Sequence, residues 1–151
     1  HIGGVYGDKK AAIKRFKANF NRLSEDIKQR LVIENDDTSY TASEVLGIAR
    51  DLNLPLVLDI HHYNCNHQAG EKLEELIPAA FATWGDQRPK VHFSSPKSEA
   101  KYSSHAGDIA PEDFREFLEL TQSVTDREFD VMLECKNKDQ ALFKLREDLQ
   151  L

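Results

Sequence analysis

The chain has 151 residues, of which 40% are hydrophobic and 30% charged, and its formal net charge is −6. This composition is typical of one globular domain with enough apolar side chains to form a core. No long apolar run and no basic-then-apolar start is present, so we expect neither a membrane span nor a signal peptide. The two cysteines, Cys65 and Cys135, are too few for a disulfide framework and indicate a reducing, cytoplasmic compartment.

The negative charge at first argues against nucleic acid, because surfaces that bind DNA are usually basic. Carboxylates that hold divalent ions are neutralised once loaded, however, so the charge does not exclude a DNA partner. The chain opens on His1 rather than Met, within the glycine-containing segment His1–Gly7. This opening is typical of a cut fragment or of a trimmed tag, and the charge of a fragment need not represent that of the whole protein.

The first half of the chain alternates helical and strand patterns. Apolar residues recur with a helical period over Asp8–Leu23, and the short apolar run Leu31–Glu34 predicts a buried strand. Thr41–Glu44 fits a capping box and begins a helix that continues to Leu52. The run Leu56–Ile60 predicts the second strand.

The same alternation continues through the second half. A helix is predicted over Glu71–Trp84, followed by a strand over Lys90–Ser94. Pro111 suits the first turn of the next helix. Phe129–Glu134 predicts the fourth strand, and Asp139–Leu149 predicts the last helix.

Four strands, each followed by a helix, indicate a parallel α/β sheet. Their continuous apolar runs suit strands that are covered on both faces. Two architectures compete, an open doubly wound sheet and part of a TIM-type (βα)₈ barrel. A full barrel takes roughly 250 residues, so four units are about half of one. We expect residues 1–151 to form the C-terminal half of such a barrel, with the strands in sequential order and the helices outside.

Each predicted strand carries a possible metal ligand at or near its end. These residues are Glu34, Asp59, His92 and Glu134. Because the catalytic groups of a barrel gather at the C-terminal ends of its strands, the four side chains should converge on one rim. Mixed carboxylate and imidazole ligands suit manganese, zinc or iron.

A single acid after a strand is more often a helix cap or a solvated turn residue, and we expect that of Asp36 and Asp37. Glu34, Asp59 and Glu134 differ because each directly continues a buried apolar run. A buried carboxylate without a partner is costly. Three such coincidences favour a site.

Other polar residues allow a plainer interpretation from the pattern alone. Lys90 lies two residues before His92 and shares its face of the strand, but spacing alone favours a surface lysine. Cys65 and His67 lack the second pair of ligands that a structural zinc site needs and are predicted loop residues. His105 by itself would also be a loop histidine.

Together these residues resemble the UV-damage endonuclease family. The resemblance runs from the first residue to the last, and its specificity comes from the combination and order of the motifs. The matching stretches are His1–Lys9, Leu31–Asp37, Leu58–His62, Lys90–Ser95, Ser104–Ile109 and Val131–Lys136.

The resemblance implies a (βα)₈ barrel that binds up to three divalent ions, typically manganese. It implies that Glu34 bridges two ions and that His1 helps to hold the first. Asp59, His92 and Glu134 would hold the second ion together with Glu34.

The resemblance further implies that His62 and His105 hold the third ion. It also implies that Lys90 can be carboxylated and act with Glu34 in catalysis. The family's first half, which supplies another metal-binding histidine and the residues that probe the lesion, has no counterpart in this chain. We therefore expect the isolated chain to be inactive although it binds metal.

The reaction implied is hydrolysis of the phosphodiester immediately 5′ to a UV photoproduct in double-stranded DNA, leaving a 3′-hydroxyl and a 5′-phosphate. Two enzymes of the same architecture remain as alternatives, an apurinic-site endonuclease and a metal-dependent sugar isomerase. A third alternative is a non-catalytic half-barrel that self-associates, because half a barrel leaves two open strand edges.

Overall fold

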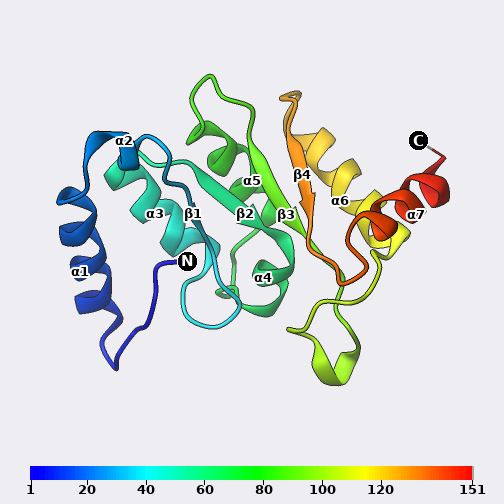
Figure 1. Ribbon diagram of the computed structural model, residues 1–151, viewed down its shortest axis with the longest axis horizontal. Coiled ribbons are helices and arrows are strands. Elements are labelled where there is room, and N and C mark those ends of the chain that lie inside the picture. Colours follow the sequence, from blue (N-terminus) through cyan, green and yellow to red (C-terminus); the bar gives the residue numbers. More distant parts are fainter. Residues whose placement is uncertain (151) are drawn as a thin grey trace.

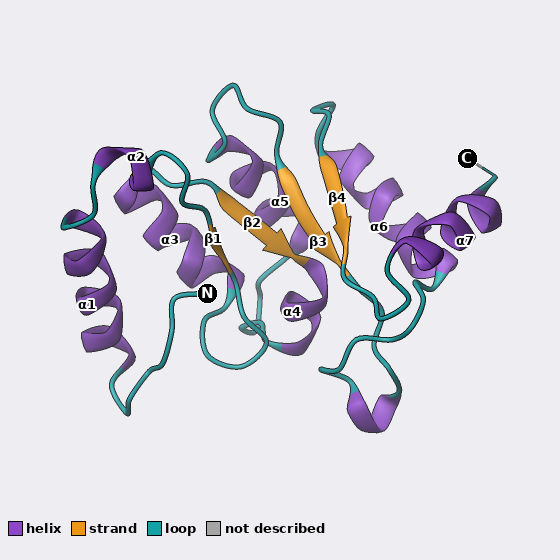
Figure 2. Cartoon of the chain, viewed as in Figure 1, coloured by secondary structure: helices purple, strands orange, loops and turns teal. Residues whose placement is uncertain are grey.

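The computed structural model describes residues 1–150. Its four strands form one parallel sheet in the order β1-β2-β3-β4 (Figures 1 and 2). This sequential order without reversal confirms the expectation for part of a barrel and excludes a doubly wound sheet over these strands. The strands are β1 (Ile33–Glu34), β2 (Leu56–Asp59), β3 (Lys90–Phe93) and β4 (Asp130–Leu133).

Helices connect and flank the strands. Five match predicted helices after the strands or before the first one, and α2 and α4 are additional short helices that the sequence pattern did not predict. A single 3-10 turn, η1 (Glu99–Lys101), lies in the connection from β3 to α6. The α-helices are α1 (Lys9–Asn21), α2 (Glu25–Lys28), α3 (Ala42–Leu52), α4 (Ile60–Cys65), α5 (Leu73–Ala82), α6 (Pro111–Val124) and α7 (Asp139–Leu149).

Local chemistry explains where α3 begins and ends. The predicted capping box is present: the Thr41 hydroxyl accepts from the Glu44 amide, and the Glu44 carboxylate accepts from the Thr41 amide. These contacts satisfy two amides that a helix start leaves unpaired. At the other end Asn53 adopts a left-handed conformation (φ 53°), which stops the helix before β2.

The strands are shorter than their apolar runs predicted. The run from Leu31 pairs only at β1 (Ile33–Glu34), and Ile60 begins α4 rather than ending β2. The last strand stops one residue before Glu134. Apolar runs report burial, whereas a strand needs a paired neighbour, so the unpaired ends of these runs become loop or helix.

The two faces of the sheet differ in their covering. Leu58 of β2 pairs with Val91 of β3, and both side chains are fully buried in the core on the helical face. On the opposite face a cavity of about 560 Å³ is bordered by Lys90, His92 and Met132, among others. Only β2 is buried at every position, so the expectation of strands covered on both faces holds for that strand alone.

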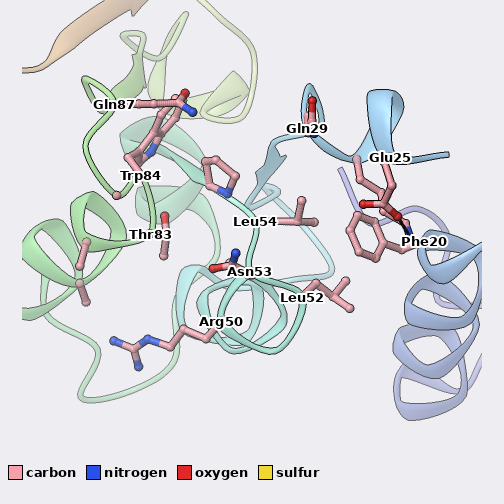
Figure 3. Close-up of a pocket in the computed structure, with 16 residues that line it drawn as sticks. Phe20, Glu25, Gln29, Arg50, Leu52, Asn53, Leu54, Thr83, Trp84 and Gln87 are labelled. Carbon is pink, nitrogen blue, oxygen red and sulfur yellow. Dashed lines mark hydrogen bonds and ion pairs between the residues drawn. The ribbon is translucent and has the colours of Figure 1, made fainter. Parts of the chain in front are cut away.

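A larger cavity of about 900 Å³ lies at the N-terminal ends of the strands (Figure 3). Leu54 and Asn53 border it from the segment before β2, and Trp84 borders it from the segment before β3. The Trp84 indole donates to the Leu56 carbonyl and ties these segments together. In barrels this end of the sheet serves stability rather than chemistry, and we assign this cavity no catalytic role. No helix within residues 1–150 is long and apolar enough to cross a membrane.

The placement of the core can be tested by replacing a buried and an exposed leucine, each with alanine. Leu58→Ala should lower the free energy of unfolding by about 2–5 kcal/mol, because it removes a fully buried side chain and leaves a cavity. Leu142→Ala, on the exposed face of α7, should change it by less than about 1 kcal/mol. Urea titrations measure both. Equal reductions would contradict the placement of the core.

Candidate metal centre

Four polar side chains meet at the C-terminal edge of the sheet. Asp59 at the end of β2 stands directly beside His92 of β3 in the parallel register. Glu34 ends β1, and the amide of Glu134 continues the pairing of β4 by donating to the Phe93 carbonyl at 2.9 Å. The four predicted strand-end residues therefore lie at one rim.

His92 is the centre of this group. Its Nδ1 atom lies 2.9 Å from Glu34 Oε1, 3.2 Å from Glu134 Oε1 and 3.9 Å from Asp59 Oδ2. One imidazole nitrogen thus faces three carboxylates from three other strands. Glu34, His92 and Glu134 each offer a ligand atom, and these atoms lie within 4.8 Å of one another.

A second group of possible ligands shares Glu34 with the first. His1 Nε2 lies 3.6 Å from Glu34 Oε2, and His62 Nδ1 lies 3.6 Å from Glu34 Oε1. The ligand atoms of these three residues also lie within 4.8 Å of one another. Glu34 therefore belongs to both groups of candidate ligands.

The remaining two candidates, His105 and Lys90, lie at the margins of the cluster. His105 Nδ1 is 3.7 Å from Glu134 Oε2. The Lys90 ammonium is 3.5 Å from the Asp130 carboxylate and 5.3 Å from the centre of the Trp84 ring. Lys90 borders the same cavity as His92 and so shares the open face, but its ammonium pairs with Asp130 rather than with a carboxylate of the cluster.

Asn35 fixes the backbone under the cluster, a role that the sequence pattern did not reveal. Its side-chain amide donates to the Asp59 carbonyl and its side-chain oxygen accepts from the Asp59 amide, both at 2.9 Å. Asp59 in turn caps α4 by accepting from the His62 amide at 2.7 Å. Asn35 is completely buried. The ends of β1 and β2 and the start of α4 are therefore locked together.

His61 was also not assigned a role from the sequence. Its buried ring stacks on Tyr102 at 5.8 Å and meets His105 edge-on at 5.3 Å. It thereby connects α4 with the loop that carries His105. The Cys65 sulfur lies 3.9 Å from Nε2 of His61. Cys65 is the last residue of α4, so the prediction that it is a loop residue is wrong.

The expectation of a solvated turn is wrong for Asp36. Its carboxylate is buried and accepts hydrogen bonds from the backbone amides of Thr38, Ser39 and Tyr40. These three amides replace the water that would solvate the carboxylate, and their hydrogen bonds hold the loop after β1 around Asp36. Asp37 is half-buried in the same loop.

The electrostatics of the cluster reflect burial and crowding. Burial raises the pKa of Asp59 to about 6, against the opposing effect of His62. Burial also acts to raise the pKa of Glu34, but its hydrogen bond with His92 and the charges of the histidines hold that pKa below its usual value. The pKa of His92 is raised, because its hydrogen bond and attraction to Glu34 outweigh the effect of burial.

The donor set fits a divalent cation. Asp59 Oδ2 is buried and has no hydrogen-bond partner within residues 1–150, an arrangement that needs an explanation in a folded protein. It faces the region where His62 and His92 approach Glu34. A cation there would neutralise the crowded carboxylates and satisfy that oxygen.

The fold and the cluster define a class of protein: four units of a (βα)₈ barrel with carboxylate and imidazole side chains at the C-terminal rim. The family model described as UV-endonuclease UvdE matches residues 1–151. The chain belongs to this family, which confirms the resemblance seen in its sequence.

Relatives and a solved structure agree with this assignment. The UV DNA damage endonuclease of Bacillus cereus (strain G9842) is 44% identical over 151 residues, which cover 99% of this chain and 47% of the relative. That of Bacillus mycoides (strain KBAB4) is 44% identical over 147 residues, covering 96% and 46%. The crystal structure of SacUVDE matches with a TM-score of 0.87 and 33% identity, covering 99% of this chain and 50% of that one. SacUVDE is a TIM barrel, and the chain spans about half the length of the relatives it matches.

The protonation of His92 should govern metal affinity. An ion can bind its Nδ1 atom only after the proton there is displaced, and the raised pKa of His92 keeps the ring protonated to higher pH. Manganese affinity should therefore fall as the pH is lowered from 8 to about 6, by up to about tenfold per pH unit for each displaced proton.

Calorimetric titrations with manganese over this pH range provide the measurement. His92→Gln should weaken binding and flatten its pH dependence. His67→Gln, an exposed histidine outside the cluster, should leave both unchanged. An unaltered pH profile in His92→Gln would show that this histidine is not a ligand.

Proposed function

We propose that this chain supplies the metal-binding half of a DNA-repair endonuclease that hydrolyses the phosphodiester immediately 5′ to a UV photoproduct. The products would be a 3′-hydroxyl and a 5′-phosphate, and the partner is damaged double-stranded DNA. The observation that carries this proposal is the pair of ligand groups that share Glu34, in a chain of the UvdE family.

Each candidate ligand has a place in the proposal. Glu34 would hold two ions, the first together with His1. Asp59, His92 and Glu134 would hold the second with Glu34. The positions of the two histidines around one carboxylate support this division, because His1 approaches Glu34 Oε2 whereas His92 approaches Glu34 Oε1.

A third ion would be held by His62 and His105, as the family resemblance implies, although the ligand atom of His62 also lies within 4.8 Å of those of His1 and Glu34. The rings of His62 and His105 lie 6.3 Å apart, centre to centre, and the buried His61 ring lies 6.3 Å from the first and 5.3 Å from the second. Manganese suits a site of mixed imidazole and carboxylate donors. Lys90 is proposed to join the site after its neutral amine adds carbon dioxide and releases a proton, which would give a carbamate on the face that Lys90 shares with His92.

The chemistry divides between ions and protein. Clustered divalent ions lower the pKa of a bound water and stabilise the attacking and leaving oxygens of an in-line displacement. The protein's part is positioning: Asn35 and the α4 cap hold Asp59 and His62 in place, and the parallel register sets His92 beside them. The carboxylates of the cluster also repel DNA phosphates unless cations are bound, so a phosphate can approach the ligands themselves only in the presence of metal.

The isolated chain should bind manganese but nick irradiated plasmid poorly or not at all. The half of the barrel that it does not span is proposed to carry a ligand for the first ion and the lesion-probing residues. Mispositioning by about 1 Å can already cost about 100-fold in rate. Joining the chain behind the N-terminal half of the Bacillus cereus relative should restore nicking in manganese. Plasmid relaxation on agarose gels measures both proteins.

Glu34→Ala provides the matching test of the site. It should remove most manganese binding in the chain and lower nicking by the chimera at least about 100-fold, because one carboxylate serves both ligand groups. Glu34→Gln keeps the shape of the side chain and removes its charge, so it separates loss of the metal ligand from misfolding of the variant. Glu74→Ala, an exposed carboxylate on α5, is the control. An active Glu34→Ala chimera would refute the bridging role, and full activity of the chain alone would refute the account of damage recognition.

A further inference from the structure

The helix α1 concentrates positive charge in an acidic chain. Six of the 20 Lys and Arg residues fall within residues 8–22, with Asp8 as the single acid there, although the net charge of the chain is −6. Lys9 pairs with Glu44 at 2.9 Å, and Lys17 pairs with Asp51. The other four have no acidic partner within residues 1–150: Lys10, Lys14, Arg15 and Arg22.

Helix stability does not account for this pattern. The first turn of α1 contains no acidic residue and begins with Lys9 and Lys10, although the dipole of a helix favours negative charge at this end. Only the cap by Asp8, which accepts from the Ala11 amide, complements the dipole. Lys10 is therefore an exposed cation at an unfavourable position, and it has no acidic partner within residues 1–150. Together with the other cations of α1 that have no acidic partner there, it suits a polyanionic partner.

The start of α1 lies beside the rim that carries the metal centre. The Lys9 ammonium contacts Glu44 in the first turn of α3 and lies 5.7 Å from the centre of the Tyr40 ring, just after the loop that leaves β1. His1, a few residues before α1, reaches Glu34. In Figure 1 the blue segment before α1 projects on the side of the sheet toward which the strand arrows point. A duplex lying across the rim would therefore pass α1.

A strained turn presents an aromatic ring at this edge. Tyr6 and Gly7 both have positive φ (53° and 79°), and the Asp8 amide donates to the Val5 carbonyl at 3.2 Å to close the turn. Asparagine or glycine is usual where Tyr6 stands. The Tyr6 side chain is nevertheless 86% exposed, and the Arg15 guanidinium lies 5.5 Å from its ring centre. A strained, exposed ring that orients a cation suggests a binding function.

We propose that Lys10, Lys14 and Arg15 form a surface that binds the phosphate backbone of duplex DNA beside the metal centre, with Tyr6 positioning Arg15. Lys10 and Lys14 are exposed and one helical turn apart, so both can contact one strand. The inference rests on the proposed function, because it takes DNA as the substrate at the rim. The surface would offset the repulsion between DNA and the negative net charge of the chain. It would not recognise a base sequence, because contacts to phosphates carry no sequence information.

The test is the salt dependence of DNA binding by the whole chain. Fluorescence anisotropy with an undamaged, labelled duplex in EDTA gives the association constant at several salt concentrations. Lys10→Gln/Lys14→Gln should reduce the slope of its logarithm against that of the salt by about 2, or about 1 for each phosphate that is no longer neutralised. Arg50→Gln/Arg146→Gln changes the net charge equally at the far ends of α3 and α7 and should leave the slope unchanged.

The role of Tyr6 has its own comparison. Tyr6→Ala should reduce the slope by about 1, as Arg15→Gln does, whereas Tyr6→Phe keeps the ring and should retain the slope. Equal slopes in the lysine pair and its arginine control, or no measurable binding by the chain, would overturn the proposal. Because the duplex is undamaged and metal is chelated, these results are separate from those of the nicking experiment.

Discussion

The parallel register between β2 and β3 is the constraint on which the site depends. It sets Asp59 directly beside His92, and the period of two along each strand turns Glu34 and His92 to the same open face. Parallel strands all end at one edge, so ligands that are 25 or more residues apart in the chain meet within a few ångströms. A slip by one residue would turn the ligands of one strand into the apolar core.

The same arrangement lowers the stability of the fold, because it brings like charges together in a buried position. Three carboxylates surround one imidazole nitrogen, and burial raises the pKa of Asp59 to about 6. The fold tolerates this because the neutral side chain of Asn35 holds the backbone of Asp59, and the His62 amide donates a hydrogen bond to the Asp59 carboxylate. The positions of these candidate ligands are therefore fixed without a cation, and one Asp59 oxygen has no hydrogen-bond partner within residues 1–150.

Charge is distributed unevenly along the chain, and this distribution reconciles an acidic protein with the proposed DNA substrate. Three carboxylates, those of Glu34, Asp59 and Glu134, meet where cations are proposed to bind. At the margin of the same rim, α1 holds a group of basic residues without acidic partners in the described part of the chain. Net charge alone obscures this division. A polyanion approaching the rim would meet the lysines of α1 beside the proposed ions.

The amino-acid sequence by itself determined the order of strands and helices, the capping box at Thr41 and the residue types at the strand ends. These follow from local patterns: hydrophobic period, side-chain hydrogen bonding within one turn, and polar residues directly after apolar runs. Only the tertiary structure decided where the strands stop, that Asp36 is buried, and that Asn35 and His61 support the ligands. Those roles depend on partners that are distant in the sequence, such as Asp59 for Asn35 and Tyr102 for His61. A local sequence pattern does not indicate which distant residues become neighbours.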